Sequence, residues 1–424
     1  MRKPLSIFSF NLNNKLKGRK IPAPIVESVL TLIFLALMVR GLSLLVENKQ
    51  SYGKYNEFYK YSGEYEVLFC GSSHMMNAVL PMELWKDYGI HSYNIGNGAE
   101  TIPVTYHVVL NALDYAAPEV LVMDVFYAYS DQILPEISKE MPHQFFDLLP
   151  LSENKLRSVR EIFRDEKDRW NYIIPFSIYH SRWNELTKND LRREDECLGG
   201  ARLLLASYTL RDTLFDPPAS HDIPGRPREY IKKVKELCDE RGIRLICVVN
   251  PYAMWQENRT CNVNFKKEMA ELGIEFLDLR EDVVDIYADS ADDMHVNLCG
   301  ERKVTDFYGR YLSSILPRRD SSYSSDSREI VWNERYAAYV QKKEDFLAMC
   351  EDAAPLLSDL NDPDFYFEIS MRSDTVPDDT MLRMLENAKN YDNVSIMTDD
   401  DMKESLKIRI RRKDSEEYFV NRSF

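Results

Sequence analysis

Two short segments, far apart in the chain, contain the side chains of a serine nucleophile and its base. The first is Gly71-Ser72-Ser73-His74, which follows an apolar run, and in the second Asp292 stands three residues before His295. A serine hydroxyl becomes an effective nucleophile when a base takes its proton, and a carboxylate can hold the imidazole of that base in the required tautomer. We therefore predict a catalytic set of Ser73, Asp292 and His295.

Each segment alone has an ordinary structural explanation. Serine is a favoured N-cap residue, and a loop histidine can simply accept a hydrogen bond at a helix cap. Together, the two segments indicate a catalytic site if the fold brings them close to each other. A serine at the turn from a parallel strand into a helix lies at the sheet edge where open α/β folds bind ligands, and backbone N–H groups at the helix start can stabilise an oxyanion.

The predicted strands and helices around the two segments would bring them close together. Short apolar runs alternate with helical patterns, which predicts a parallel sheet covered on both faces. The first segment follows the first strand and the second follows the last, so neighbouring strand ends would bring them together. The expected strands are Glu66–Cys70, His91–Ile95, Val120–Phe126, Arg244–Val249 and Glu275–Leu279, and the expected helices are Met82–Asp87, Thr105–Tyr115, Arg228–Arg241, Phe265–Leu272 and Glu301–Leu312.

Composition shifts divide the chain into an anchor, an α/β domain and a C-terminal appendage. A serine-rich stretch marks the linker before the appendage, which has the pattern of a small α/β domain and no chemical motif. The expected parts are a basic tail (1–23), a transmembrane helix (24–46), a stalk (47–61), the α/β domain (62–317) with a helical insertion (131–227), a linker (318–329) and the appendage (330–424).

The N-terminal apolar run predicts a membrane anchor. It has about the ~20 residues that a spanning helix needs, and its charges, Glu27 and Arg40, stand towards the ends. No small-residue cleavage site follows it, and the preceding residues are basic. We expect a single uncleaved span in the cell membrane, with the N-terminus cytoplasmic and the α/β domain extracellular.

Charge and cysteine spacing exclude several classes of function. The 424 residues carry a formal net charge of -15, so a nucleic acid would be repelled by most of the surface. The seven cysteines form no C-x-x-C pair, which is unlike a zinc site or a disulfide framework. The chemistry predicted for the serine site requires no metal and no organic cofactor.

Four sequence blocks in this order resemble the SGNH/GDSL hydrolase superfamily over roughly residues 65–315. The resemblance implies a three-layer α/β/α, flavodoxin-like fold, with Ser73 as nucleophile, His295 as base and Asp292 as its orienting acid. It also implies that the N–H of Gly98, or of Gly96, joins that of Ser73 in an oxyanion hole. The four blocks are GSSH after a strand, YNIGNG (93–98), VLVMDVF (120–126) and D-x-x-H-x-N-x-x-G (292–300).

Two positions depart from the family pattern. Ser72 stands in place of the usual aspartate of the first block, and Asp124-Val125-Phe126-Tyr127 lacks the asparagine that completes the oxyanion hole in the third. Losing one such donor typically costs about 10²–10³ in rate. Asn77 is one candidate replacement, and His180 or Arg182 of the insertion is another.

The GSSH form and the anchor make the chain similar to bacterial envelope acylation proteins, including the alginate O-acetylation and D-alanyl-lipoteichoic-acid transfer families. This similarity implies a multi-pass membrane O-acyltransferase as partner and an envelope polysaccharide or teichoic-acid-like polymer as acceptor. In the insertion, Arg182 and Trp183 beside His180 have the residue types that stack on a sugar or hold an anion. The alternative is helix-face packing of Trp183 with a solvated Arg182.

The leading prediction is therefore serine-dependent acyl transfer or acyl-ester hydrolysis on a cell-envelope glycopolymer. Two alternatives remain at this stage. The chain could be a non-catalytic, membrane-anchored scaffold of an acylation complex, which the missing asparagine favours. It could instead be a surface carbohydrate-binding protein that uses the aromatic insertion.

Overall fold

The computed structural model describes eight stretches of the chain in two compact units. One unit contains Met1–Glu47 and Ile174–Arg192, and the other contains Asn48–Ile173 and Arg193–Phe424. The described residues are 22–46, 51–138, 141–191, 195–205, 222–252, 263–280, 282–317 and 326–424.

The larger unit is built on a five-stranded parallel sheet with the strand order β2-β1-β3-β4-β5. All five predicted strands are present, and only β5, at one edge of the sheet, has no buried residue. Every residue of β1 and β3 is buried. The strands are β1 (Val67–Cys70), β2 (Ser92–Asn94), β3 (Val120–Asp124), β4 (Arg244–Val249) and β5 (Glu275–Asp278).

Helices cover both faces of this sheet and form the predicted α/β/α layers. Alternate strand residues such as Phe69 and Val122 pack against one helical layer, while Leu68 and Met123 join the core on the other side. The first layer contains α3 (Ser73–Met76), α4 (Pro81–Tyr88) and α13 (Leu298–Ile315). The second contains α2 (Tyr52–Tyr61), α5 (Ile102–Ala112), α11 (Gly225–Arg241) and α12 (Phe265–Glu271).

The expected stalk at 47–61 is wrong where the structure describes it. Residues 52–61 form α2, whose Tyr55 and Phe58 are buried in the main core. The polar residues of α2 are buried with partners: the Nζ of Lys54 donates to the carbonyl of Gly96, and Glu57 pairs with Arg335 at 2.8 Å. Burial of an amphipathic, tyrosine-rich helix explains why the segment is not an extended spacer.

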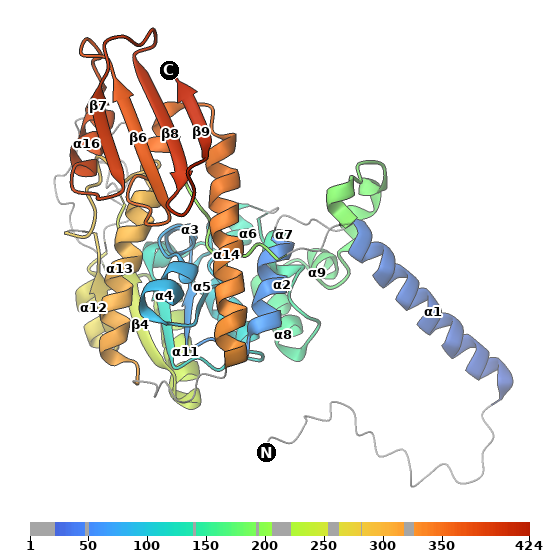
Figure 1. The fold of residues 1–424 in the computed structure, drawn as a ribbon. Coiled ribbons are helices and arrows are strands. Elements are labelled where there is room, and N and C mark those ends of the chain that lie inside the picture. Colours follow the sequence, from blue (N-terminus) through green and yellow to red (C-terminus); the bar gives the residue numbers. More distant parts are fainter. Residues whose placement is uncertain are drawn as a thin grey trace. The chain divides into compact units, whose positions relative to one another are not determined.

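The C-terminal module, residues 326–424, has the predicted α/β composition but is part of the larger unit. Its four strands form a mixed sheet in the order β7-β6-β8-β9, drawn in red in Figure 1. Buried Phe365 and Ile369 belong to the same hydrophobic cluster as the main core. The elements are α14 (Asp326–Met349), α15 (Ala353–Leu357), β6 (Phe365–Met371), α16 (Asp379–Ala388), β7 (Val394–Thr398), β8 (Leu406–Arg412) and β9 (Tyr418–Ser423). The linker therefore ends before residue 329, and residues 318–325 lie outside the described ranges.

The insertion contains several short helices between residues 134 and 191, as predicted, whereas residues 195–205 and 222–224 contain no helix. Val159 and Ile162 of α8 pack into the main core, and the hydroxyl of Ser158 lies 3.1 Å from Nδ1 of His107 in α5. The short 3₁₀ helix η2 (Phe126–Tyr129) lies just before the insertion, whose first elements are α6 (Leu134–Ile137), α7 (His143–Phe146), α8 (Glu153–Ile162) and α9 (Glu166–Ile173).

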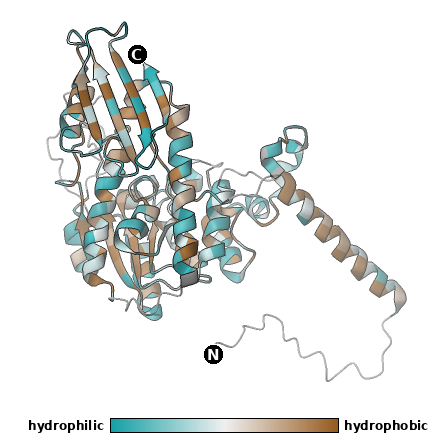
Figure 2. Ribbon diagram, viewed as in Figure 1, coloured by the Kyte–Doolittle hydropathy of each residue, from teal (hydrophilic) through white to brown (hydrophobic). Residues whose placement is uncertain are grey.

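The smaller unit contains α1 (Ala23–Val46) and the end of the insertion. Among the described residues, α1 is the one helix long and apolar enough to cross a membrane, and Figure 2 shows it brown along most of its length. Apolar side chains such as Leu32 (66%) and Phe34 (65%) are exposed. The other elements are α10 (Phe176–Tyr179), η3 (His180–Asn184) and η4 (Lys188–Leu191).

Candidate active site

The turn after β1 sets the position of Ser73. Gly71 has φ +126°, and a Cβ at this position would lie 2.7 Å from the Cβ of Asp124, so a glycine is required. Ser72 is the N-cap of α3: its Oγ accepts from the N–H of His74 and donates to Oδ2 of Asp124 at 2.7 Å. Ser73 is the first residue of α3, at the carboxyl end of β1.

The loop before α13 brings the second segment to Ser73. Nε2 of His295 lies 2.8 Å from Oγ of Ser73, and Nδ1 lies 2.9 Å from Oδ2 of Asp292. Oδ1 of Asp292 also accepts from the backbone N–H groups of Met294 and His295, both at 2.8 Å. The structure thus forms a continuous Asp292–His295–Ser73 hydrogen-bonded chain from the three residues that the sequence analysis selected.

The carboxylate of this chain remains ionised. Partial burial acts to raise the pKa of Asp292, but the hydrogen bond and charge of His295 and the two backbone N–H groups outweigh it, so the pKa is lowered. The side chain of Asp292 is 47% exposed and that of His295 is 20% exposed. A charged acid can therefore hold Nδ1–H of His295, while Nε2 is left to exchange a proton with Ser73.

The second-block loop runs directly against the Ser73 turn. The N–H of Asn97 donates to the carbonyl of Gly71 at 3.0 Å, and a Cβ on Gly96 would lie 3.2 Å from the carbonyl oxygen of Ser72. Gly98 follows in this loop. Asn77 is the C-cap of α3, its N–H donates to the carbonyl of Ser73, and its Oδ1 is buried without a partner among the described residues. These contacts place both candidate oxyanion elements on segments bonded to the nucleophile turn.

The third-block strand end is occupied by an acid and an aromatic ring. Asp124 accepts from Ser72 and from the N–H of Phe126. Complete burial raises the pKa of Asp124 to about 6, although these hydrogen bonds oppose the shift. Ser72 is thus the hydrogen-bond partner of Asp124, at the end of the neighbouring strand β3. A pair of aspartates here would bring two carboxylates together.

His74 is a site residue that the sequence analysis missed. Its ring stacks on Phe126 with centroids 3.8 Å apart and lies 5.4 Å from the ring of His295. Burial, together with the nearby His295, lowers the pKa of His74 well below its usual value, so its imidazole is neutral. Its Nδ1 has no partner among the residues that the structure describes. The sequence feature that could have revealed His74 is its position next to Ser73 in GSSH, but sequence alone does not distinguish a buried ring from an exposed one.

Lys54 is the second residue that was missed. Its Nζ is 2.5 Å from the carbonyl oxygen of Gly96, and the hydroxyl of Tyr55 donates to Oδ1 of Asn97. Burial lowers the pKa of Lys54, and the carboxylates of Glu196, Glu100 and Glu57 oppose that effect. Helix α2 therefore supports the loop that carries Gly98.

The insertion residues have partners that differ from the predicted substrate contacts. Nη1 of Arg182 donates to the carbonyl of Val46 at the end of α1, and Nη2 pairs with Asp190 at 3.0 Å. Nδ1 of His180 lies 3.0 Å from the carbonyl of Ser177, and Trp183 is 72% exposed. Arg182 therefore completes the carbonyl end of α1, and the alternative, in which Trp183 packs in a helix face and Arg182 is solvated, is wrong. Substrate binding by the three residues stays a prediction that nothing in these contacts supports.

Comparisons with known proteins add a fold likeness. The sequence matches no protein-family model and no curated protein. Similar solved structures include a GDSL-like lipase from Bacteroides thetaiotaomicron (11% identity, 62% of this chain, 100% of that chain, TM-score 0.32). Others are a lipase/acylhydrolase from Enterococcus faecalis (10%, 61%, 100%, 0.30) and an acetyl xylan esterase (10%, 59%, 99%, 0.28). Identities of this size carry no information on substrate or activity.

No metal centre is apparent in the described part of the chain. Within those ranges, no group of three or more His, Cys, Asp or Glu side chains is arranged to hold a metal ion. Four of the cysteines, Cys70, Cys238, Cys247 and Cys299, are buried, where a free cysteine behaves as a small hydrophobic residue.

Proposed function

We propose that this chain is a membrane-anchored serine enzyme that forms an acyl-ester intermediate on Ser73. The observation that carries the proposal is the position of His295, whose two ring nitrogens lie 2.8 Å from Ser73 Oγ and 2.9 Å from Asp292 Oδ2. An imidazole held by an ionised carboxylate on one side and a hydroxyl on the other is arranged for general-base activation of that hydroxyl.

The reaction begins when Oγ of Ser73 attacks the carbonyl carbon of an acyl ester. His295 Nε2 accepts the hydroxyl proton, and Asp292 stabilises the imidazolium and keeps its Nδ1–H in place. The tetrahedral intermediate then breaks its ester C–O bond, and His295 returns the proton to the leaving alcohol. The product of this half-reaction is acyl-Ser73 and a free alcohol.

The second half-reaction regenerates the enzyme. His295 takes a proton from an acceptor hydroxyl, whose oxygen attacks the acyl carbonyl. Collapse of the intermediate breaks the bond to Ser73 Oγ, which recovers its proton from His295. With water as the acceptor the outcome is hydrolysis, and with a sugar hydroxyl the outcome is acyl transfer.

Backbone N–H groups would stabilise the negative oxygen of each intermediate. The N–H of Ser73 stands at the start of α3 and has no acceptor within the helix. Gly98 would contribute the second N–H, supported by the hydrogen bond that joins Asn97 to the Gly71 turn. Asn77 would contribute its side-chain amide, supported by its position one turn after Ser73.

The acceptor is proposed to be a cell-envelope glycopolymer. The apolar helix α1 supports a membrane anchor, and the basic residues before it support a cytoplasmic N-terminus with the α/β domain outside. A multi-pass membrane O-acyltransferase would supply acyl groups to such a domain. The polymer and this partner rest on the sequence resemblance.

Active-site labelling tests the proposal. The full chain in detergent micelles is treated with a fluorophosphonate probe and assayed on a simple acetyl ester, beside Ser73→Ala, His295→Ala and the control Ser314→Ala. Ser314 is a serine on α13 whose Oγ donates to the carbonyl of Tyr311. We expect labelling and turnover in the wild type and the control, and loss of both in the two site variants.

A non-catalytic scaffold is the second candidate, because the third-block strand end carries Phe126 in place of an amide side chain. A wild-type chain that neither reacts with the probe nor hydrolyses the ester would favour it. Labelling that persists unchanged in Ser73→Ala would contradict the proposed nucleophile.

A further inference from the structure

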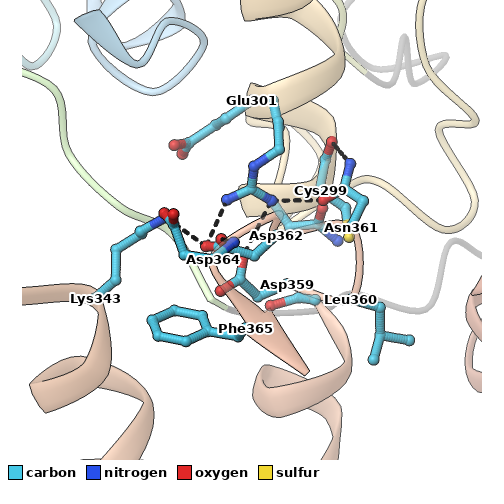
Figure 3. A network of polar contacts seen from close by, with 12 residues as sticks. Cys299, Glu301, Lys343, Asp359, Leu360, Asn361, Asp362, Asp364 and Phe365 are labelled. Carbon is cyan, nitrogen blue, oxygen red and sulfur yellow. Dashed lines mark hydrogen bonds and ion pairs between the residues drawn. The ribbon is translucent and has the colours of Figure 1, made fainter. Parts of the chain in front are cut away.

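A buried network of charges joins the C-terminal module to the α/β domain. Arg302 of α13 forms ion pairs with Glu83 of α4 at 3.0 Å, with Asp359 at 3.0 Å and with Asp362 at 2.9 Å. Lys343 of α14 pairs with the same Asp362 at 2.6 Å. The side chain of Arg302 is 11% exposed and those of Asp359 and Asp362 are fully buried. Figure 3 shows Lys343, Asp359 and Asp362 of this network.

A second set of contacts fixes the first turn of α13. The N–H of Cys299 donates to the carbonyl of Ser358 at 2.8 Å, and Nδ2 of Asn361 donates to the carbonyl of Cys299 at 3.1 Å. Oδ1 of the same Asn361 accepts from Nη1 of Arg302 at 2.6 Å. Asn361 therefore holds both the backbone and a side chain of α13, as drawn in Figure 3.

The start of α13 is in turn bonded to the loop that carries His295. Asn297, two residues after His295, is the N-cap of α13 and its N–H donates to the carbonyl of Asp289 at 2.7 Å. Lys303 of α13 pairs with the carboxylate of Asp289 at 2.7 Å. The N–H of Ala291 then donates to the carbonyl of His295 at 2.9 Å. Displacement of the α13 start would therefore move the loop and the imidazole with it.

We propose that the C-terminal module is a positioning element for His295, acting through Asn361 and Arg302 at the start of α13. This inference rests on the proposed serine chemistry and assigns a role to residues 326–424, for which the sequence offers no motif. Asn361 and Arg302 contact neither Ser73 nor the imidazole, so they are positioning residues. Their effect is expected on the alignment of His295 with Ser73, because small misplacement of a catalytic base slows the chemical step.

The alternative is that the network stabilises the fold without affecting the site. A matched pair of variants separates the two readings in the full chain. Asn361→Ala removes the contacts to Cys299 and Arg302, whereas Val420→Ala removes core volume from β9 within the same module and takes no hydrogen bond from α13. Both variants lower the stability of the module, and only the first releases the α13 start.

The experiment measures kcat and KM on the acetyl ester together with the nuclear magnetic resonance signals of the ¹⁵N-labelled His295 imidazole. We expect Asn361→Ala to lower kcat by about 10- to 100-fold with little change in KM, and to alter the Nδ1 signal that reports the bond to Asp292. Val420→Ala should retain wild-type kcat and the wild-type signal. Arg302→Lys should recover more of kcat than Arg302→Gln, because it keeps a cation among the carboxylates.

Two results would overturn the inference. One is a wild-type kcat and imidazole signal in Asn361→Ala, and the other is an equal loss of kcat in Val420→Ala, which would make stability the cause. The imidazole signal does not require turnover, so a wild type that is inactive while Asn361→Ala still shifts the signal would refute the proposed enzyme and leave the positioning role standing. An active wild type whose imidazole signal is unchanged in Asn361→Ala would refute the positioning role and leave the proposed enzyme standing.

Discussion

Two clusters of ionisable side chains in the larger unit both contain aspartates but pair them with different partners. Around Ser73, one carboxylate holds one imidazole, and both side chains are partly exposed. Around Arg302, carboxylates from α4 and the C-terminal module enclose two cations, and most of the side chains are fully buried. The first cluster leaves Nε2 of His295 aimed at a hydroxyl, whereas the second directs its charges at one another.

The two clusters should respond differently to the loss of one side chain. A buried, mutually paired network resists change, because removal of one partner leaves the others unpaired at low dielectric. In the Ser73 cluster, Nε2 of His295 faces the neutral hydroxyl of Ser73 and the side chains of His295 and Asp292 are partly exposed, so a proton can move between Nε2 and Oγ. Equivalent substitutions in the two clusters should therefore separate activity from stability.

The largest effect is expected for Asp292→Asn. The amide cannot hold Nδ1–H of His295 as a carboxylate does, so the wrong tautomer and a weaker base should lower kcat by about 10⁴-fold, as in other Ser-His-Asp sites. The unfolding temperature should change little, because the side chain is half exposed. Steady-state kinetics and thermal unfolding measure these two quantities. A fully active Asp292→Asn variant would contradict the role assigned to Asp292.

Asp362→Asn is the matching change in the buried network. It takes the charge away from Arg302 and Lys343 while keeping the shape, and breaking a buried pair in this way costs about 3–5 kcal/mol. Denaturant unfolding should show this loss. Its expected effect on kcat, through the start of α13, is far smaller than that of Asp292→Asn. Equal unfolding free energies for Asp362→Asn and the wild type would mean that the network contributes no net stability.

His74 should make stability depend on pH. Its folded pKa lies well below the unfolded value near ~6.5, so the unfolded chain binds the extra proton as the pH falls below about 6.5. Stability is then lost on the acid side, by about 1.4 kcal/mol per pH unit for one group. Relative to the wild type, His74→Phe should lose correspondingly less stability between about pH 6.5 and 5, as measured by urea unfolding. Parallel pH profiles for the two proteins would show that His74 is protonated in the fold.

The smallest effect is expected for Ser72→Ala. This change removes the N-cap of α3 and the hydrogen bond to Asp124, and cap losses cost about 1 kcal/mol. Because Ser72 opposes the burial that raises the pKa of Asp124 to about 6, the pKa should rise further in the variant. Calorimetry and carboxyl resonances measure the two changes. A lower pKa in Ser72→Ala would contradict the assigned hydrogen bond.

The sheet and the pairing of Ser73 with His295 and Asp292 were predictable from sequence. Apolar runs such as 120–126 report burial on both faces directly, and the rule that ligands bind at strand ends then places Ser73 beside His295. Both signals are local or depend only on topology. The sequence predictions therefore agree best with the structure where neighbouring residues or the strand order determine it.

The remaining features depend on distant partners. The sequence of helix α2 has a polar pattern, yet its Lys54 and Glu57 are buried, where they contact Gly96 and Arg335. No local periodicity reveals these distant partners. Arg182 beside Trp183 has the composition of a sugar site, but its guanidinium is bonded to Val46 and Asp190. The part played by the C-terminal module likewise depends on contacts between α13 and residues far along the chain.

The most direct measurement of the central claim is the mass of the peptide that contains Ser73 after rapid acid quench of the full chain with an acetyl ester. The acyl-serine mechanism requires one acetyl group on Ser73 in the wild type and no acetylated peptide in Ser73→Ala. An acetyl group on another residue, or ester turnover that survives in Ser73→Ala, would contradict it.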